Sequence, residues 1–143
     1  MLLGGRGLAS GCALVAHAVA PDCAVVGVEP AAGDDARQSM EAGHIVKIAT
    51  PRTIADGAQT TSVGDITFAL MQRYLNSIVT VDDAALGATM RLLAERMKII
   101  VEPTGCLAPA AALAAAPQWQ GRRVGILLSG GNIDITTFSR LVG

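Results

Sequence analysis

Short apolar runs alternate along the chain with longer amphipathic or alanine-rich segments, and turn residues separate them. Apolar runs of strand length predict buried strands at Cys23–Glu29, Ser77–Val81 and Arg123–Ser129. The longer segments predict helices at Leu8–Ala20, Asp34–Ala42, Asp65–Leu75, Asp82–Met97, Thr104–Ala116 and Ile133–Leu141. Because strands alternate with helices, the order predicts an α/β fold, with an open parallel sheet and helices on both of its faces.

A long connection rich in Thr, Pro, Asp and Gly runs from Lys47 to Gly64. A loop of this length in a compact domain is more often functional than idle. We therefore expect it to contribute to a site at the carboxyl ends of the strands.

Composition limits the class of protein. The 143 residues form one domain, 51% of them are hydrophobic and 16% are charged, which excludes a disordered chain or a coiled coil. The net charge of −1 and an aromatic content of 3% disfavour nucleic-acid binding. The longest apolar runs, Cys12–Ala20 and Ala108–Ala116, are too short to span a membrane, and the first residues do not form a signal peptide. Three unclustered cysteines fit a cytoplasmic protein with free thiols.

Three glycine-bearing turns are the candidate chemistry. Gly4–Gly7 precedes a predicted helix, where backbone N–H groups and the helix dipole can hold a phosphate. Ser129–Asn132 follows a predicted strand, and Ala55–Gly57 lies in the long connection. Each turn taken alone fits a purely structural role equally well. The glycine spacing near the start does not match the dinucleotide-binding pattern, which disfavours a nicotinamide-binding domain.

Four motifs in a fixed order resemble one enzyme family. They are Gly-Gly-x-Gly-Leu-x-Ser-Gly from Gly4, Ala55–Gly57, Val101–Gly105 and Leu128–Asn132. This order resembles the second half of the fold-type II pyridoxal-phosphate enzymes, in particular the threonine/serine dehydratase and serine racemase group. The resemblance covers the chain from Gly4 to about Val142, and it implies pyridoxal 5′-phosphate as the cofactor.

The resemblance implies a set of cofactor-binding residues. The turn that forms the cup for the cofactor phosphate consists of Gly4, Gly5, Arg6 and Gly7. Ser129 resembles the hydroxyl that faces the pyridine nitrogen, a neutral partner that leaves the ring unprotonated. Gly57 resembles a backbone position beside the ring, and Glu102 resembles the acid near the cofactor edge.

The resemblance also implies a divalent-cation site, formed by Glu29, the Gly33 carbonyl and Asp35 as in the racemase-like members. Two carboxylates and a carbonyl suit Mg²⁺ or Ca²⁺, with water at the remaining positions. The alternative is that Glu29 ends a strand and Asp35 caps a helix.

The chain departs from the family pattern at two places. Arg6 stands where the phosphate cup of the family usually has glycine. Either its guanidinium adds a contact to the phosphate, or its bulk keeps the phosphate away from the backbone N–H groups of the turn. The Schiff-base lysine of the family lies in an upstream motif, and the two lysines here, Lys47 and Lys98, do not lie in such a motif. We therefore expect no catalytic residue in this chain, and we interpret residues 1–143 as a single partial domain, the C-terminal half of a lyase catalytic region.

The resemblance implies a threonine or serine dehydratase, an ammonia-lyase that gives a 2-oxo acid and ammonia. A serine or hydroxyaspartate racemase/dehydratase is the alternative within enzymes. A non-catalytic or split half that needs a separate lysine-bearing partner is the alternative of another class. The implied partners are a small hydroxy amino acid and the N-terminal half of the enzyme, which assembles as a homo-oligomer when intact.

Overall fold

The computed structural model describes residues 1–4 and 6–143. Its helices and strands are, in chain order, α1 (Gly7–Val19), β1 (Val26–Pro30), α2 (Asp35–Ala42), α3 (Asp65–Tyr74), β2 (Ser77–Val81), α4 (Asp83–Leu92), α5 (Leu107–Ala114) and α6 (Ile135–Val142). A π-helical turn, Leu93–Met97, extends α4, and short 3₁₀ turns lie at Asp56–Ala58, Thr104–Cys106 and Ala116–Trp119.

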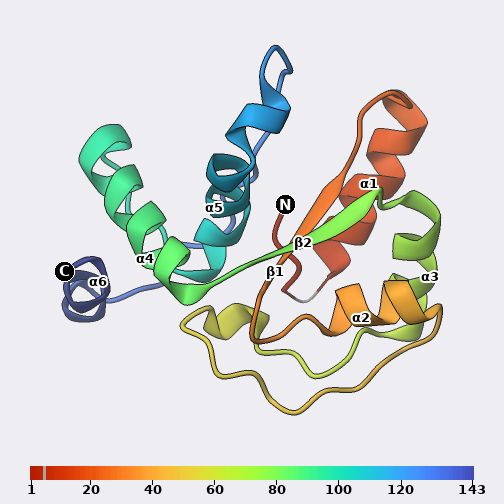
Figure 1. The fold of residues 1–143 in the computed structure, drawn as a ribbon, viewed down its shortest axis with the longest axis horizontal. Coiled ribbons are helices and arrows are strands. Elements are labelled where there is room, and N and C mark those ends of the chain that lie inside the picture. The colour runs from red at the N-terminus through yellow and green to blue at the C-terminus, as the bar shows by residue number, and fades with distance from the viewer. Residues whose placement is uncertain (5) are drawn as a thin grey trace.

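The two strands form a parallel sheet at the centre of the molecule (Figure 1). The register pairs Val26 with Ser77 and Pro30 with Val81, and Leu2 bridges to Val28 on the other side of β1. Both strands therefore end at the same edge of the sheet, and that edge leads into α2 and α4. The α/β class and the parallel sheet predicted from the sequence are confirmed.

Helices cover both faces of the sheet. On one face α1, α2 and α3 pack around Leu3, Phe68 and Met71. On the other face α4 and α5 pack on Val28 and Val81, and α5 contacts both strands. Figure 1 shows the first group of helices to the right of the strands and α4 and α5 to the left. The sheet thus lies between two hydrophobic clusters, and β1 is more deeply buried there than β2.

Most predicted elements are confirmed within a few residues. The strand Ser77–Val81 matches β2, the helix predicted at Asp34–Ala42 matches α2, and Gly43, with φ of 73°, ends that helix. The strand predicted at Arg123–Ser129 is wrong: the described segment has no regular secondary structure there. A β-strand needs a neighbour for its N–H and C=O groups, and these residues lie exposed with no adjacent strand among the described residues.

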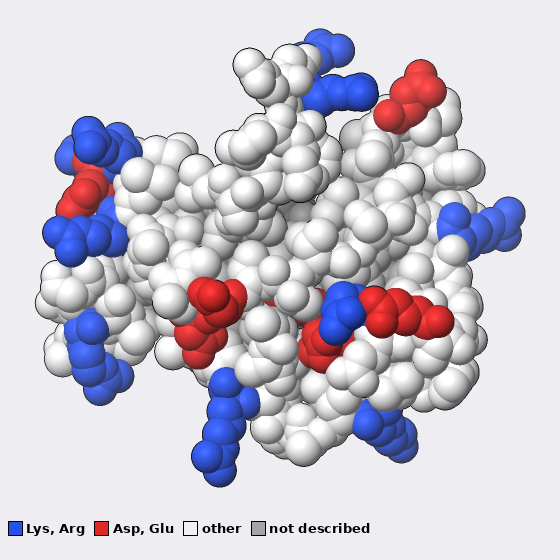
Figure 2. Space-filling model, in the orientation of Figure 1, with Lys and Arg blue, Asp and Glu red and all other residues white. Residues whose placement is uncertain are grey.

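Exposed apolar side chains follow the alanine-rich segment along the chain. The first half of Ala108–Ala116 is buried against the sheet, whereas side chains of the segment that follows face solvent. These exposed side chains are Val124, Ile126, Leu127 and Leu128. Charged groups form small, separated clusters on the face drawn in Figure 2, with uncharged surface between them. No helix in the described ranges is long and apolar enough to cross a membrane.

Candidate cofactor site

The start of α1 is open to an anion. Arg6 is the N-cap residue, its side chain makes no capping hydrogen bond, and the first turn carries no acidic residue. The helices α4 and α6, by contrast, are capped by the side chains of Asp82 and Asp134. A Cβ built on Gly7 would meet no atom within 4 Å, so there is free space beside the first turn. Uncapped N–H groups beside open space suit a phosphate oxygen.

Gly4 brings this turn against the long connection. A Cβ at Gly4 would lie 2.7 Å from the carbonyl oxygen of Gly57, so only glycine fits there. The Gly57 amide donates to Thr104 Oγ1 at 3.0 Å and to Asp56 Oδ1 at 2.8 Å. The contacts place three predicted motifs, distant in sequence, next to one another.

The fourth motif joins through Gly105 and Gly130. A Cβ at Gly105 would lie 2.9 Å from the Gly130 carbonyl oxygen and 3.3 Å from that of Ser129. Gly130 has φ of 115° and lies against the Glu102 carboxylate, which also accepts a hydrogen bond from the Asn132 amide at 3.1 Å. The exposed Ser129 therefore stands at the end of a continuous series of contacts that begins at Gly4.

Arg6 does not follow this series. Its Nη2 atom donates to Glu29 Oε1 at 3.1 Å and to Asp35 Oδ1 at 2.5 Å. The three side chains are at most 3% exposed. A second nitrogen of the guanidinium reaches the Ser62 carbonyl in the long connection, at 3.4 Å. The guanidinium thus binds two buried carboxylates. This geometry does not support the phosphate contact that was one of the two alternatives for Arg6.

The acidic pair organises the start of α2. Glu29, at the end of β1, accepts hydrogen bonds from the amides of Ala36 (3.2 Å) and Arg37 (2.9 Å) in the first turn. Glu29 therefore caps α2 from another element, because the N-cap residue Asp34 makes no capping hydrogen bond. Burial raises the pKa of both Glu29 and Asp35, and the Arg6 guanidinium opposes this shift.

A divalent cation does not fit this arrangement. Mg²⁺ and Ca²⁺ bind oxygen atoms at about 2.0–2.6 Å and repel a cationic side chain. Here a guanidinium nitrogen already lies within hydrogen-bonding distance of one oxygen from each carboxylate. Within residues 1–4 and 6–143, no group of three or more His, Cys, Asp and Glu residues is arranged to hold a metal ion. Gly33 lies in the turn between the two acids, where a Cβ would meet the Pro51 ring at 2.5 Å.

The structure groups the predicted residues into two clusters that meet at the glycine turn. One cluster contains Gly4, Gly57, Glu102 and Ser129, and the other contains Arg6, Glu29 and Asp35. The phosphate contact predicted for Gly5 lies outside the described residues. Lys47 and Lys98 are both exposed, and Lys98 donates to the Glu95 carbonyl.

Two contributors were missed by the sequence-based predictions. Thr104 joins Gly57 to the Glu102 motif, and its position inside the Val101–Gly105 motif was the available signal. Ser62 acts through its backbone carbonyl, so its side-chain type carries no signal.

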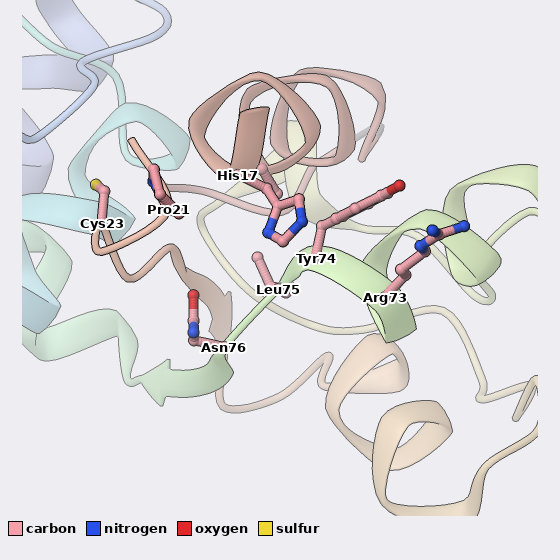
Figure 3. A pocket seen from close by; sticks show the side chains of 8 residues that line it. His17, Pro21, Cys23, Arg73, Tyr74, Leu75 and Asn76 are labelled. Atoms are coloured by element: carbon pink, nitrogen blue, oxygen red, sulfur yellow. The ribbon is translucent and has the colours of Figure 1, made fainter. Parts of the chain in front are cut away.

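A small cavity of about 110 Å³ lies at the opposite, amino-terminal edge of the sheet. Figure 3 shows His17 from α1 beside Tyr74 from α3, with Cys23 and Asn76 nearby. The two rings lie 5.1 Å apart at an angle of 48°, which is a packing geometry. His17 thus packs against Tyr74, and this cavity lies away from the glycine turns.

Comparison with known proteins agrees with the geometry. A family profile described as "Pyridoxal-phosphate dependent enzyme" matches residues 1–130. The chain is 51% identical to the L-threo-3-hydroxyaspartate ammonia-lyase of Saccharomyces cerevisiae over 98% of its own length and 43% of the relative's. It is 50% identical to the serine racemase of Schizosaccharomyces pombe, again over 98% of its length and 43% of the relative's.

Solved structures show the same relation. A threonine deaminase from T.th. superposes with a TM-score of 0.86 and 43% identity, over 94% of this chain and 45% of that protein. Maize serine racemase superposes with a TM-score of 0.89 and 35% identity, over 97% of this chain and 44% of that protein. The chain therefore spans less than half the length of the proteins that it matches.

Proposed function

Because the chain belongs to the family of pyridoxal-phosphate dependent enzymes, we propose that it forms part of an ammonia-lyase for a small 3-hydroxy amino acid. Threonine and serine are the first candidates for the substrate, and the products are a 2-oxo acid and ammonia. The observation that supports this most is the continuous series of contacts from Gly4 through Gly57 and Thr104 to Glu102. It joins the four motifs that the resemblance assigns to one cofactor.

The residues of this chain hold the cofactor at two ends. The open first turn of α1, which begins at Gly7, would bind the phosphate, because it has no side-chain cap and open space lies beside Gly7. The Ser129 hydroxyl would hydrogen-bond to the pyridine nitrogen, and Gly57 and Glu102 would lie beside the ring. Bound pyridoxal phosphate supplies an electron sink that acidifies the α C–H bond of the amino acid.

A neutral hydroxyl at Ser129 would leave the ring nitrogen unprotonated, because it has no negative charge to stabilise a pyridinium and can donate a hydrogen bond to the nitrogen lone pair. This moderates the electron sink and suits elimination of a β-hydroxyl group. Loss of that group as water, followed by hydrolysis, converts serine into pyruvate and ammonia and threonine into 2-oxobutanoate and ammonia. The lysine that moves the α-proton comes from a separate segment, in line with the exposed positions of Lys47 and Lys98.

Racemisation of serine is a second candidate, favoured by the 50% identity to the serine racemase of Schizosaccharomyces pombe. Elimination from 3-hydroxyaspartate is favoured equally by the 51% identity to the ammonia-lyase named for that substrate. Both reactions begin with removal of the same α-proton, so the same residues of this chain serve them. Exposed free Cys23 fits a reducing compartment such as the cytoplasm.

Co-expression with a lysine-bearing segment tests the proposal. The segment is the part of the Saccharomyces cerevisiae ammonia-lyase that precedes its match to this chain. We expect the complex to form pyruvate, 2-oxobutanoate or oxaloacetate from serine, threonine or threo-3-hydroxyaspartate, and D-serine formation reports racemisation. A Ser129→Ala variant should lower kcat, whereas Ser139→Ala on the exposed side of α6 should not. A well-formed complex that turns over none of these substrates would support the non-catalytic alternative.

A further inference from the structure

A cationic side chain occupies the position between the two acids where the resemblance suggests a metal ion. Arg6 replaces the glycine of the family pattern, and its Nη2 atom lies 3.1 Å from Glu29 Oε1 and 2.5 Å from Asp35 Oδ1. A metal ion bound to those same two oxygen atoms would overlap this nitrogen. Binding of a divalent cation and binding of the guanidinium are therefore mutually exclusive.

We propose that the Arg6 guanidinium is a built-in counterion that replaces a divalent cation between Glu29 and Asp35 and ties the glycine turn to the start of α2. The charges support this: two buried carboxylates need a positive partner, and the guanidinium is always protonated at physiological pH. The arrangement makes the chain independent of Mg²⁺ and Ca²⁺, because its own side chain supplies the charge.

The backbone of Arg6 adopts an unfavourable conformation in this arrangement. Arg6 has φ of 58°, a left-handed conformation that glycine adopts readily and that other residues rarely adopt. This backbone conformation lets the side chain turn from the glycine turn towards the end of β1. The two ion pairs and the hydrogen bond to the Ser62 carbonyl offset the conformational strain.

The ion pairs also set the position of the candidate phosphate-binding turn. Glu29 is fixed at the end of β1 and holds the first amides of α2, so it is a rigid anchor. Arg6 lies in the turn directly before α1 and is bound to that anchor. Arg6 thus acts as a positioning residue: it orients the turn through contacts with its own chain, and its guanidinium does not need to touch the cofactor.

Direct measurement of Mn²⁺ binding to the 143-residue chain tests this, with or without the lysine-bearing segment, since all three residues belong to this chain. Mn²⁺ binding is followed by electron paramagnetic resonance, and thermal unfolding is measured with and without Mn²⁺, Mg²⁺ or Ca²⁺. The variants are Arg6→Gly, Arg6→Gly with Asp35→Asn, and Arg37→Gln. Arg37 is a matched control because it also pairs with two acids, Asp34 and Glu41, at an exposed position of the same region.

The wild-type chain and Arg37→Gln should bind no Mn²⁺ between the acids and should show no shift in Tm. Arg6→Gly should bind one Mn²⁺, and saturating cation should raise its Tm by about 5–15 °C, while adding Asp35→Asn should abolish both effects. Binding of one Mn²⁺ to the wild-type chain with a rise in Tm like that expected for Arg6→Gly would overturn the proposal. So would an Arg6→Gly chain that folds without binding a cation, or one that no cation restores to the folded state.

Discussion

Two regions of the molecule differ in whether their interaction partners belong to this chain. They are the buried cluster of Arg6, Glu29 and Asp35 and the exposed segment Arg123–Ser129. In the cluster every group that forms the site belongs to this chain, and the side chains are almost completely buried. The segment has the apolar sequence of a buried strand, yet its residues are exposed and lack a neighbouring strand in the described part of the chain. A sequence pattern becomes structure only where its partners are present.

The same difference separates the two ends of the candidate cofactor site. The glycine turn at Gly4 is packed against Gly57 and fixed through Arg6, whereas Ser129 lies exposed at the end of the unpaired segment. The proposed phosphate end is therefore the part of the site that this chain already packs. We expect the proposed end at Ser129 to become ordered when a partner covers Val124–Leu128.

The largest expected effect comes from removal of the guanidinium. Arg6→Ala leaves two carboxylates buried without their cation, and loss of one partner from a buried pair costs about 3–5 kcal/mol. Urea unfolding should show this loss. Arg37→Ala breaks one exposed pair, with Glu41, and one partly buried pair, with Asp34, and should cost about 1 kcal/mol. Equal losses in the two variants would mean that the buried cluster has no special role.

The exposed segment should respond most to its partner. In the chain alone we expect the amides of residues 123–129 to exchange hydrogen rapidly and the chain to self-associate through the apolar side chains. When the lysine-bearing segment binds, exchange should slow by about 100-fold or more, which corresponds to an opening free energy of about 2.8 kcal/mol. Hydrogen exchange with mass spectrometry measures this. Strong protection in a monodisperse, isolated chain would contradict the comparison.

A smaller effect concerns the cap of α6, which follows the exposed segment. Asp134 accepts a hydrogen bond from the Thr137 amide, and this bond lowers the pKa of the carboxyl group. A lowered pKa in the folded state stabilises the fold above the ordinary value of 3.8, and that contribution disappears as the pH falls through the folded-state value. Asp134→Asn should therefore be less stable than the wild-type chain at pH 7, and the difference should shrink towards pH 3. The free energy of unfolding of both chains is measured from pH 7 to pH 3. A difference between them that does not change with pH would show that the charge of Asp134 does not stabilise α6.

The smallest effect is chemical. Burial, and then the charge of Glu102, raises the pKa of the Cys106 thiol to about 12. The thiolate is the reactive form, so Cys106 should resist alkylation at pH 8, while exposed Cys23 should react. Mass spectrometry of the alkylated chain tests this, with the unfolded chain as the control in which all three cysteines react. Rapid modification of Cys106 in the folded chain would mean that the core beside Glu102 opens.

Local signals predicted the elements whose partners lie nearby. The apolar run of β2, the acidic start of α2 and the glycine that ends it are properties of a few adjacent residues, and these elements are confirmed. The strand at Arg123–Ser129 has an equally clear pattern, but strand formation depends on a neighbour that no local pattern provides.

The site shows the same limit. The glycine motifs were identified from their order, whereas the position of the Arg6 side chain depends on a left-handed backbone angle and on acids 23 and 29 residues away. Sequence spacing does not encode such a contact. The resemblance implied a divalent cation at Glu29 and Asp35, whereas in the structure the Arg6 guanidinium pairs with both acids.

Reduction of the cofactor-loaded protein with borohydride tests the central claim most directly: that this chain holds the phosphate and ring of pyridoxal phosphate while another segment provides the lysine. Intact mass and peptide mapping locate the reduced cofactor. We expect no stoichiometric adduct on the chain alone, and in the complex a single adduct on the lysine of the added segment. A stoichiometric adduct on Lys47 or Lys98 would contradict the claim.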